Sequence, residues 1–199
     1  MPTSLARALA FHREADKLKS VLRQSRVTFD AERRENDAEH SWHLALMAMV
    51  LAPHAAEPDV DLYRVLRMIL LHDLVEIDAG DTFVYDDAHA ASQAEREQAA
   101  ATRLFGLLDE PLASELRAEW DEFEARTTRE ARFARALDRA QPMLQNLWTD
   151  GASWKKHGIT AAQVRAKNGP LVRDGSPALW AHLDALLCEA VARGVLPDR

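Results

Sequence analysis

The sequence predicts an all-α protein that folds as one helical domain. Ala, Leu, Arg and Glu dominate its 199 residues, whereas only seven glycines and eight prolines interrupt the chain. Apolar residues recur at intervals of three and four over long stretches, which is the period of an amphipathic α-helix. A chain of this length can bury a substantial core without dividing into smaller units. We therefore expect a single-domain helical bundle over residues 1–199.

The net charge and the spacing of apolar residues argue against two broad classes of function. A formal net charge of −7 leaves no excess positive field, so we expect no general binding to nucleic acid. No apolar run approaches the ~18 residues of a membrane span, so no membrane partner is expected. Arg7, Arg13 and Glu14 interrupt any signal-peptide pattern, and the expected compartment is the cytoplasm. The single cysteine, Cys188, lies in an apolar helical stretch and is expected to be buried.

The first part of the chain predicts two helices joined by a polar connector. Residues 4–23 have a loosely amphipathic pattern that ends in a basic segment. After the connector, Asn36 or Asp37 is a good N-cap for a helix over about 38–51. His40 lies on the apolar stripe of this second helix, so its side chain is expected to point inward.

A third helix carries the most unusual segment of the chain. It begins near Asp61 and reaches about Val75, and Gly80 is expected to end it in the left-handed conformation. Residues 81–87 then form a loop, and a strongly charged helix follows over about 88–107.

The next segment predicts a long helix with an acid on its apolar side. Pro111 is tolerated in the first turn of the preceding helix, and residues 127–130 contain a capping box that opens a helix over 129–148. Asp138 lies beside the apolar stripe of that helix. Pro142 removes the amide donor that would satisfy the carbonyl of Asp138, so we expect a bend there.

The C-terminal part reads as a helical extension over about 160–193. A second capping box starts at Thr160, and Ser176 followed by proline caps a final helix over about 178–192. Between these signals, residues 168–176 are expected to form a loop.

The third helix places ionisable groups inside an apolar run. His72, Asp73 and Glu76 interrupt a sequence of Ile, Leu and Val, and spacings of three and four put His72 and Glu76 on the apolar face. Burying a carboxylate without a partner is expensive, so such a group is paired, neutralised or bound to a metal. A metal explains the cluster if further ligands lie elsewhere in the chain, and His40 and Asp138 are the candidates.

These residues, in their order, resemble the HD superfamily of metal-dependent phosphohydrolases. The dipeptide His-Asp alone is a worthless signal, but the ordered set is specific: His40, then His72-Asp73 with Glu76 and Gly80-Asp81, then Asp138. Within that superfamily the chain is most similar to the 5′-deoxynucleotidase branch. The resemblance places the core of the metal site over about residues 36–148.

The resemblance implies a metal centre with two catalytic acids beside it. One divalent cation, which is Mn²⁺, Co²⁺, Fe²⁺, Zn²⁺ or Mg²⁺, would be bound by His40, His72, Asp73 and Asp138. Ligand chemistry alone does not choose among these metals. Glu76 and Asp81 match catalytic residues, and spacing does not decide which of them activates water and which assists the leaving 5′ oxygen.

Two further positions concern substrate recognition. The family uses an Arg at the end of its first helix to engage the substrate, and Arg23 matches it. The bacterial members follow this Arg with a Trp that helps select deoxyribose, whereas this chain has Gln24. The preference between deoxy and ribo sugars is therefore open. His43 competes with His40 as a ligand and is instead expected in the core or beside the ligands.

The implied activity is hydrolysis of deoxyribo- or ribonucleoside 5′-monophosphates to nucleoside and phosphate. A different small phosphate ester, a cyclic nucleotide or a nucleoside triphosphate is the first alternative. A non-catalytic helical metal-binding or scaffold protein is the second. The expected partners are the small-molecule substrate and, because related nucleotidases often form dimers, a second copy of the chain.

Overall fold

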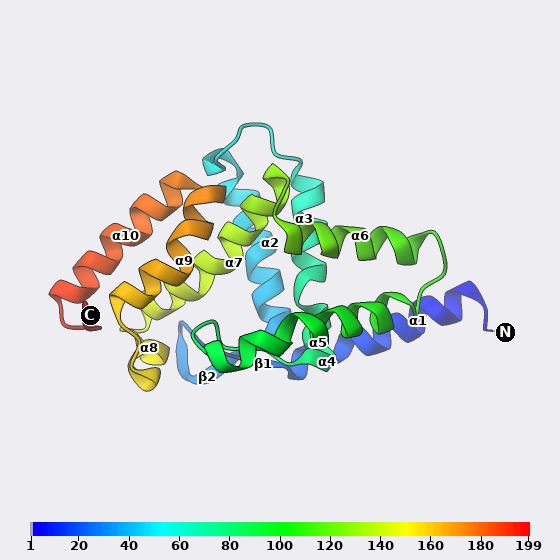
Figure 1. The fold of residues 1–199 in the computed structure, drawn as a ribbon, viewed down its shortest axis with the longest axis horizontal. Coiled ribbons are helices and arrows are strands. Elements are labelled where there is room, and N and C mark those ends of the chain that lie inside the picture. The colour runs from blue at the N-terminus through cyan, green and yellow to red at the C-terminus, as the bar shows by residue number, and fades with distance from the viewer. Residues whose placement is uncertain (1) are drawn as a thin grey trace.

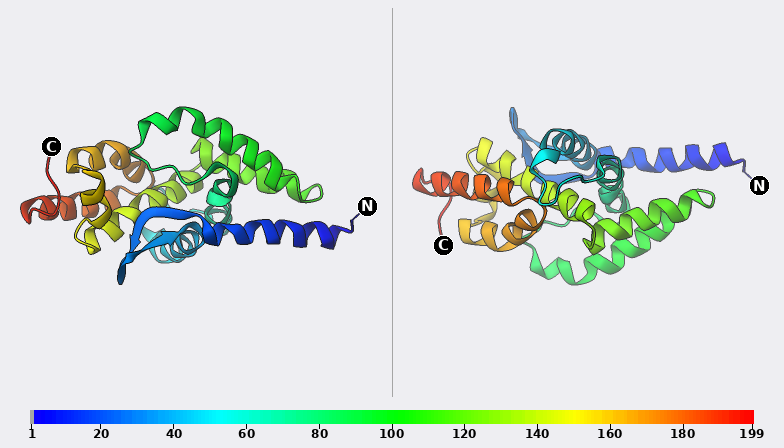
Figure 2. Two further views of the ribbon diagram at one scale, coloured as in Figure 1. Left: turned by 90° about the horizontal axis from the view of Figure 1, so that it is seen from below. Right: turned by 90° about the horizontal axis from the view of Figure 1, so that it is seen from above.

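A computed structural model describes residues 2–199, with the side chains of all of these except residues 87–91. It confirms the predicted all-α class, since the described chain is helical apart from one small two-stranded sheet (Figure 1). The two termini lie at opposite ends of an elongated molecule, with the first helix extending toward one end and the last toward the other (Figure 2).

The N-terminal helix is shorter than its pattern predicts. Helix α1 covers Ser4–Ala15, a 3₁₀ turn η1 covers Asp16–Ser20, and strand β1 covers Leu22–Val27. Strand β2, Asp30–Asn36, pairs with β1 in an antiparallel hairpin, where a polar connector was expected. The prediction that a helix extends to Arg23 is therefore wrong. Polar and charged residues predominate in both strands, and in each strand a single polar side chain is buried, so the sequence lacks the alternation that marks a strand.

Helices α2, Asp37–Leu51, and α3, Leu62–Leu71, pack against the long helix α7, Arg129–Trp148. Asn36, one of the two predicted N-cap positions, caps α2 and forms a reciprocal capping box with Glu39. A short 3₁₀ turn η2, Ala52–His54, follows α2. Helix α7 crosses the centre of the molecule, between α2 and α3 on one side and the C-terminal helices on the other (Figure 1). Its buried face therefore serves two parts of the core.

The third predicted helix does not continue as an α-helix to Val75. It tightens into a 3₁₀ turn η3, His72–Val75, and then a four-residue helix α4, Glu76–Ala79. Gly80 has φ 77° and ψ 148°, so its positive φ was predicted but its ψ is extended rather than left-handed helical. Such a backbone conformation belongs almost entirely to glycine, and it turns the chain into the loop that begins with Asp81.

Helices α5, Asp87–Phe105, and α6, Leu112–Ala125, pack beside α1 and η3. They form a second core cluster that includes Phe11, Phe105 and Trp120. Pro111 is the N-cap residue of α6 rather than a residue of its first turn. Helix α7 starts after the single N-cap Thr128, so the capping box expected from Thr127 to Glu130 does not form.

The C-terminal extension consists of α8, Ala152–His157, α9, Ala161–Gly175, and α10, Pro177–Ala192. The loop expected at residues 168–176 is wrong, because α9 continues through Pro170 to Gly175. Two glycines allow this close packing. An added Cβ would lie 2.9 Å from Trp180 at Gly169 and 2.2 Å from the carbonyl oxygen of Arg132 at Gly175. Cys188, expected to be buried, is exposed on α10.

No helix in the described part of the chain is long and apolar enough to cross a membrane.

Candidate metal centre

His40 enters the site from the second turn of α2 and is completely buried. Its Nδ1 lies 3.0 Å from Gln141 Oε1, and its Nε2 lies 3.2 Å from Asp138 Oδ1. Burial and the nearby Arg23 guanidinium lower the pKa of His40 to about 4, so the imidazole is neutral at pH 7. A neutral imidazole keeps one nitrogen lone pair available for a cation.

His72 faces His40 from the start of η3. Its Nδ1 donates a 2.6 Å hydrogen bond to the carbonyl oxygen of Ile69. Trp120 Nε1 donates a 3.1 Å hydrogen bond to the main-chain carbonyl oxygen of His72. The proton on Nδ1 leaves Nε2 as a bare acceptor. That nitrogen is buried and has no hydrogen-bond partner among the described residues. It lies 3.0 Å from Asp73 Oδ1 and 3.8 Å from Asp138 Oδ1.

This arrangement fits a bound cation. His40, His72 and Asp73 each place one ligand atom within 4.8 Å of the other two. Asp138 adds an oxygen beside both imidazoles. A lone pair directed at carboxylate oxygens is repulsive in a buried site unless a positive ion lies between them. Two nitrogens and two oxygens are a donor set that first-row divalent metals accept.

Asp138 stands among several positive groups on α7. Arg135 Nη1 donates to its Oδ2 at 3.2 Å, and Arg139 Nε lies 3.5 Å from the same oxygen. Burial would raise the pKa of Asp138, but the positive charges of Arg139 and Arg135 hold this pKa well below its usual range. Asp138 is therefore ionised and ready to bind a cation throughout the neutral range.

Three other carboxyl groups next to the ligands behave in the opposite way. Burial, with the charges of Asp73 and Asp37, raises the pKa of Glu76 well above its usual value. Burial and Asp73 raise the pKa of Asp37 to about 7, and burial raises that of Asp81 despite the nearby Arg23. Asp37, Asp73 and Glu76 also lie close enough to share a cation. Carboxyl groups whose pKa values are raised in this way suit proton transfer.

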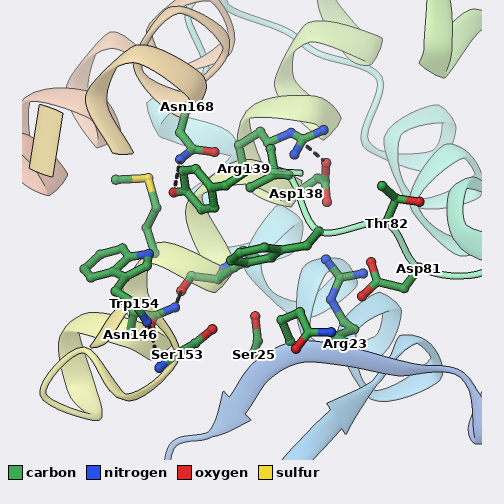
Figure 3. Close-up of a pocket in the computed structure, with 16 residues that line it drawn as sticks. Arg23, Ser25, Asp81, Thr82, Asp138, Arg139, Asn146, Ser153, Trp154 and Asn168 are labelled. Atoms are coloured by element: carbon green, nitrogen blue, oxygen red, sulfur yellow. Dashed lines mark hydrogen bonds and ion pairs between the residues drawn. The ribbon is translucent and has the colours of Figure 1, made fainter. Parts of the chain in front are cut away.

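Arg23 reaches the site from strand β1, not from a helix end. Its Nη1 donates to Asp73 Oδ2 at 2.9 Å and to Asp37 Oδ1 at 3.2 Å. The guanidinium also points toward Asp81 (Figure 3). Attraction to these acids outweighs burial and raises the pKa of Arg23 well above its ordinary value. These hydrogen bonds orient Asp73, so some of the hydrogen-bond donors of Arg23 are already used within the protein.

The ligands open into a cavity of about 360 Å³. Glu76, Asp81, Arg135 and Arg139 line it together with three of the four predicted ligands, and His40 lies behind them. A narrower recess of about 80 Å³ continues past Arg23 and Gln24 toward Asn146, Ser153 and Trp154 (Figure 3). Small-molecule sites usually have cavities of ~300–1,000 Å³, so the larger space suits a small phosphate ester.

Four residues near the centre were not among the sequence-predicted site residues. Asp37 was considered only as a cap, and Arg135, Arg139 and Gln141 were not singled out. The last three lie near Asp138 on α7, at spacings of minus three, plus one and plus three. For Arg135 and Gln141, the spacing of three residues along the helix was the available signal. His43, expected in the core or beside the ligands, lies 3.2 Å from Gln141 Nε2 through its Nδ1.

Comparison with known proteins identifies the family of this chain. The family described as HD domain matches residues 15–180. The 5′-deoxynucleotidase HDDC2 of Homo sapiens is 33% identical over 137 residues, which are 69% of this chain and 65% of the human protein. The HDDC2 protein of Mus musculus is also 33% identical, over 69% of this chain and 67% of its own length. The match to the human protein thus spans slightly less than two thirds of its length.

A solved structure extends the likeness over almost the whole chain. The crystal structure of a predicted metal-dependent phosphohydrolase from Magnetospirillum magnetotacticum MS-1 is 54% identical and superposes with a TM-score of 0.90. The alignment covers 96% of this chain and 95% of that one. The chain therefore belongs to the HD domain family.

Proposed function

We propose that this protein is a metal-dependent phosphomonoesterase that hydrolyses nucleoside 5′-monophosphates, with deoxyribonucleotides as the first substrates to test. The observation that carries the proposal is the buried nitrogen His72 Nε2, which faces two carboxylates beside acids of raised pKa. The names of the HDDC2 relatives and of the bacterial phosphohydrolase support the same reaction class.

His40, His72, Asp73 and Asp138 would hold one divalent cation between helices α2 and α7 and turn η3. Mn²⁺, Co²⁺, Fe²⁺, Zn²⁺ and Mg²⁺ all remain candidates. A bound cation of this kind lowers the pKa of a coordinated water and offsets charge on the phosphoryl group. Arg23 keeps Asp73 in position through the 2.9 Å hydrogen bond, and Arg135 does the same for Asp138 at 3.2 Å.

Glu76 and Asp81 would divide the proton transfers. Both line the cavity, and burial raises the pKa of each carboxyl group, which is the direction that suits proton exchange. Glu76 lies next to Asp73 and Asp37 and is the better placed to take the proton of the attacking water. Asp81 lies between the cavity and the recess, where it would give a proton to the departing 5′ oxygen.

Arg139 would meet the phosphate. Its guanidinium lines both the cavity and the recess, and its Nε is buried without a hydrogen-bond partner among the described residues. Burial and the nearby Arg135 and Arg23 charges lower the pKa of Arg139, so an additional anion would be favoured beside it. Arg23 would contribute the remaining positive charge on the opposite side. The nucleoside would extend past Gln24 toward the recess.

The deciding experiment is phosphate release from a panel of deoxy- and ribonucleoside 5′-monophosphates. Metal-stripped protein is reloaded separately with Mn²⁺, Co²⁺, Mg²⁺ and Zn²⁺, with other phosphate esters, cyclic nucleotides and nucleoside triphosphates included in the panel. We expect release from a deoxynucleoside monophosphate that requires metal. Activity on another ester alone would show that the substrate is not a nucleoside 5′-monophosphate. No activity on any compound, with metal bound, would contradict phosphohydrolase activity and favour the scaffold alternative.

The homodimer and the cytoplasmic compartment stay predictions. The surface around the hairpin does carry large apolar side chains, since Phe29, Trp42 and Trp148 border a groove of about 790 Å³ and are all exposed. Sedimentation velocity of the purified protein measures the oligomeric state directly, and a monomer at micromolar concentration would contradict the predicted dimer.

A further inference from the structure

We propose that Glu35 and Gln141 act together as a directed hydrogen-bond pair that sets the tautomer of His40 and thereby selects the ring nitrogen offered to the metal. The inference rests on the proposed role of His40 as a metal ligand. Both residues act through His40 and are positioning residues, since neither reaches the cavity that would hold the substrate.

The amide of Gln141 has one orientation in which all its neighbours are satisfied. Gln141 is completely buried, and its Nε2 donates to Glu35 Oε1 at 2.8 Å. The same nitrogen lies 3.2 Å from His43 Nδ1, so both amide hydrogens have an acceptor. Reversing the amide would place its oxygen against the carboxylate of Glu35. Two acceptors in contact without a hydrogen between them are strongly disfavoured in a buried site.

The fixed amide determines which nitrogen of His40 carries the proton. With Gln141 Nε2 directed at Glu35, Gln141 Oε1 lies 3.0 Å from His40 Nδ1 and can only accept. His40 must therefore donate from Nδ1, and its Nε2 keeps a lone pair toward Asp138 Oδ1 at 3.2 Å. The opposite tautomer would put a hydrogen on Nε2, where it would bond to Asp138 and block the nitrogen that a metal needs.

The two histidines of the centre reach the same tautomer by different means. His72 donates from Nδ1 to a main-chain carbonyl, which cannot exchange its oxygen for a donor. His40 relies on a side-chain amide, which can present either an oxygen or a nitrogen. Glu35 removes that ambiguity because its Oε1 accepts from both Gln141 Nε2 and Gln145 Nε2, so this oxygen carries no hydrogen to donate. Hydrogen-bond partners of this kind fix the orientation of metal-binding histidines and influence metal affinity.

Glu35 is itself held by the surrounding elements. It is buried at the end of strand β2, and Gln145 Nε2 donates to the same oxygen, Glu35 Oε1, at 2.6 Å. Gln145 makes no hydrogen bond to His40 among the described residues. It is therefore a matched control on the same helix, one turn beyond Gln141, with the same side chain and the same partner.

The first test compares Gln141→Met with Gln145→Met in the full-length protein. The ¹⁵N spectrum of the metal-free protein reports the tautomer, because protonated and unprotonated ring nitrogens have well-separated shifts. Wild type and Gln145→Met should show His40 protonated on Nδ1, whereas Gln141→Met should populate the form protonated on Nε2. The Co²⁺ dissociation constant, measured by chelator competition, should rise ~10–100-fold for Gln141→Met and stay within about twofold for Gln145→Met.

The second test exchanges the two side chains in the double variant Glu35→Gln/Gln141→Glu. A carboxylate at position 141 would accept from His40 Nδ1, and an amide at position 35 would donate to that carboxylate, so the direction of the chain is preserved. The double variant should restore the Nδ1 tautomer and most of the lost Co²⁺ affinity. A purely structural role for Gln141 does not predict this recovery.

The outcomes separate this inference from the proposed function. His40 protonated on Nε2 in the metal-free wild type would overturn the inference, as would equal Co²⁺ affinities for the two methionine variants. Failure of the exchanged pair to recover affinity above that of Gln141→Met would also overturn it. None of these readouts uses hydrolysis, so a protein that binds Co²⁺ as expected but cleaves no nucleotide would contradict the proposed function alone.

Discussion

At the scale of single residues, the site contains carboxyl groups of two kinds within one cluster. Asp138 lies between His40 and two arginines, and the charges of the two arginines hold its pKa well below the usual range. Glu76 lies among other acids, which together with burial raise its pKa. The first environment favours a permanent anion that can bind a cation, and the second favours a group that exchanges protons. Environments that drive neighbouring pKa values apart are characteristic of acid–base sites.

Replacing Glu76 with Gln should separate chemistry from metal binding. The amide keeps the size of the side chain but neither accepts a proton from water nor carries charge, so kcat should fall ~10²–10⁴-fold. Co²⁺ affinity should change little, because the four proposed ligands remain. Steady-state kinetics and chelator competition measure the two quantities. An unchanged kcat would remove Glu76 from the mechanism, and Asp81→Asn provides the parallel test of the other acid.

The raised pKa of Asp37 predicts how stability depends on pH in the metal-free protein. The unfolded carboxyl titrates near 3.8, whereas the folded one titrates at about 7. Between these values the folded state binds more protons than the unfolded state, so the free energy of unfolding falls as pH rises. The lowered pKa of His40 acts in the opposite direction in both proteins, so the prediction concerns the difference between them. Chemical denaturation from pH 4 to 7 should give wild type a more negative slope than Asp37→Asn. Equal slopes in the two proteins would contradict the prediction.

At the scale of elements, local chemistry decided what the sequence could predict. At each helix start the cap side chain accepts a hydrogen bond from the main-chain amide three residues later. The starts of α2, α9 and α10 could therefore be predicted from Asn36, Thr160 and Ser176. The hairpin could not be predicted, because its strands lack the alternation of apolar and polar residues that marks a strand. The continuation of α9 from residue 168 to Gly175 was not predicted, because it brings Gly169 against Trp180, a contact with the next helix that the local sequence does not reveal.

The same division applies to the site. The apolar run around His72 and the ordered motif identified the residues that the structure brings together from α2, η3 and α7. Arg23 was named, but its strand and its hydrogen bond to Asp73 depend on pairing between β1 and β2. Gln141 and Glu35 were missed because they are far apart in sequence and meet only when α7 packs behind the hairpin.

The capping box of α2 should influence the metal site as well as stability. Asn36 and Glu39 fix the first turn of the helix that presents His40 one residue later. Asn36→Ala should lower the free energy of unfolding by ~0.5–2 kcal/mol and also weaken Co²⁺ binding, because the first turn can fray. Thr160→Ala removes an equivalent box from α9, far from the ligands, and should cost similar stability with unchanged Co²⁺ affinity. Loss of affinity in both variants would mean that a general loss of stability is responsible.

At the scale of the whole molecule, α7 joins two of the three core clusters. Leu137 belongs to the cluster with α2 and α3, and Met143 belongs to the cluster with α9 and α10. Asp138 therefore stands at the junction between them. His40 comes from α2, and His72 follows α3, so the proposed ligands connect three separate elements of the core.

Metal loading should therefore stabilise the entire fold rather than one loop. An ion that binds only the folded state adds ~2.7 kcal/mol at a free concentration of 100 times its Kd. For a chain of this size that corresponds to a rise in Tm of roughly 5–10 °C. Calorimetry with increasing Co²⁺ should show a single transition that moves upward. Two transitions, with only one responding to Co²⁺, would show that the ligands do not unite the core.

Asp138→Asn is the control that ties this shift to the proposed site. The amide still fits beside His40 but loses the charge that the cation and the two arginines share, so Tm should become almost independent of Co²⁺. The metal-free variant should also be less stable than metal-free wild type, because Arg135 and Arg139 then face each other without their common anion. A Co²⁺-dependent shift as large as that of wild type would mean that the ion binds elsewhere, and the junction on α7 would then be structural.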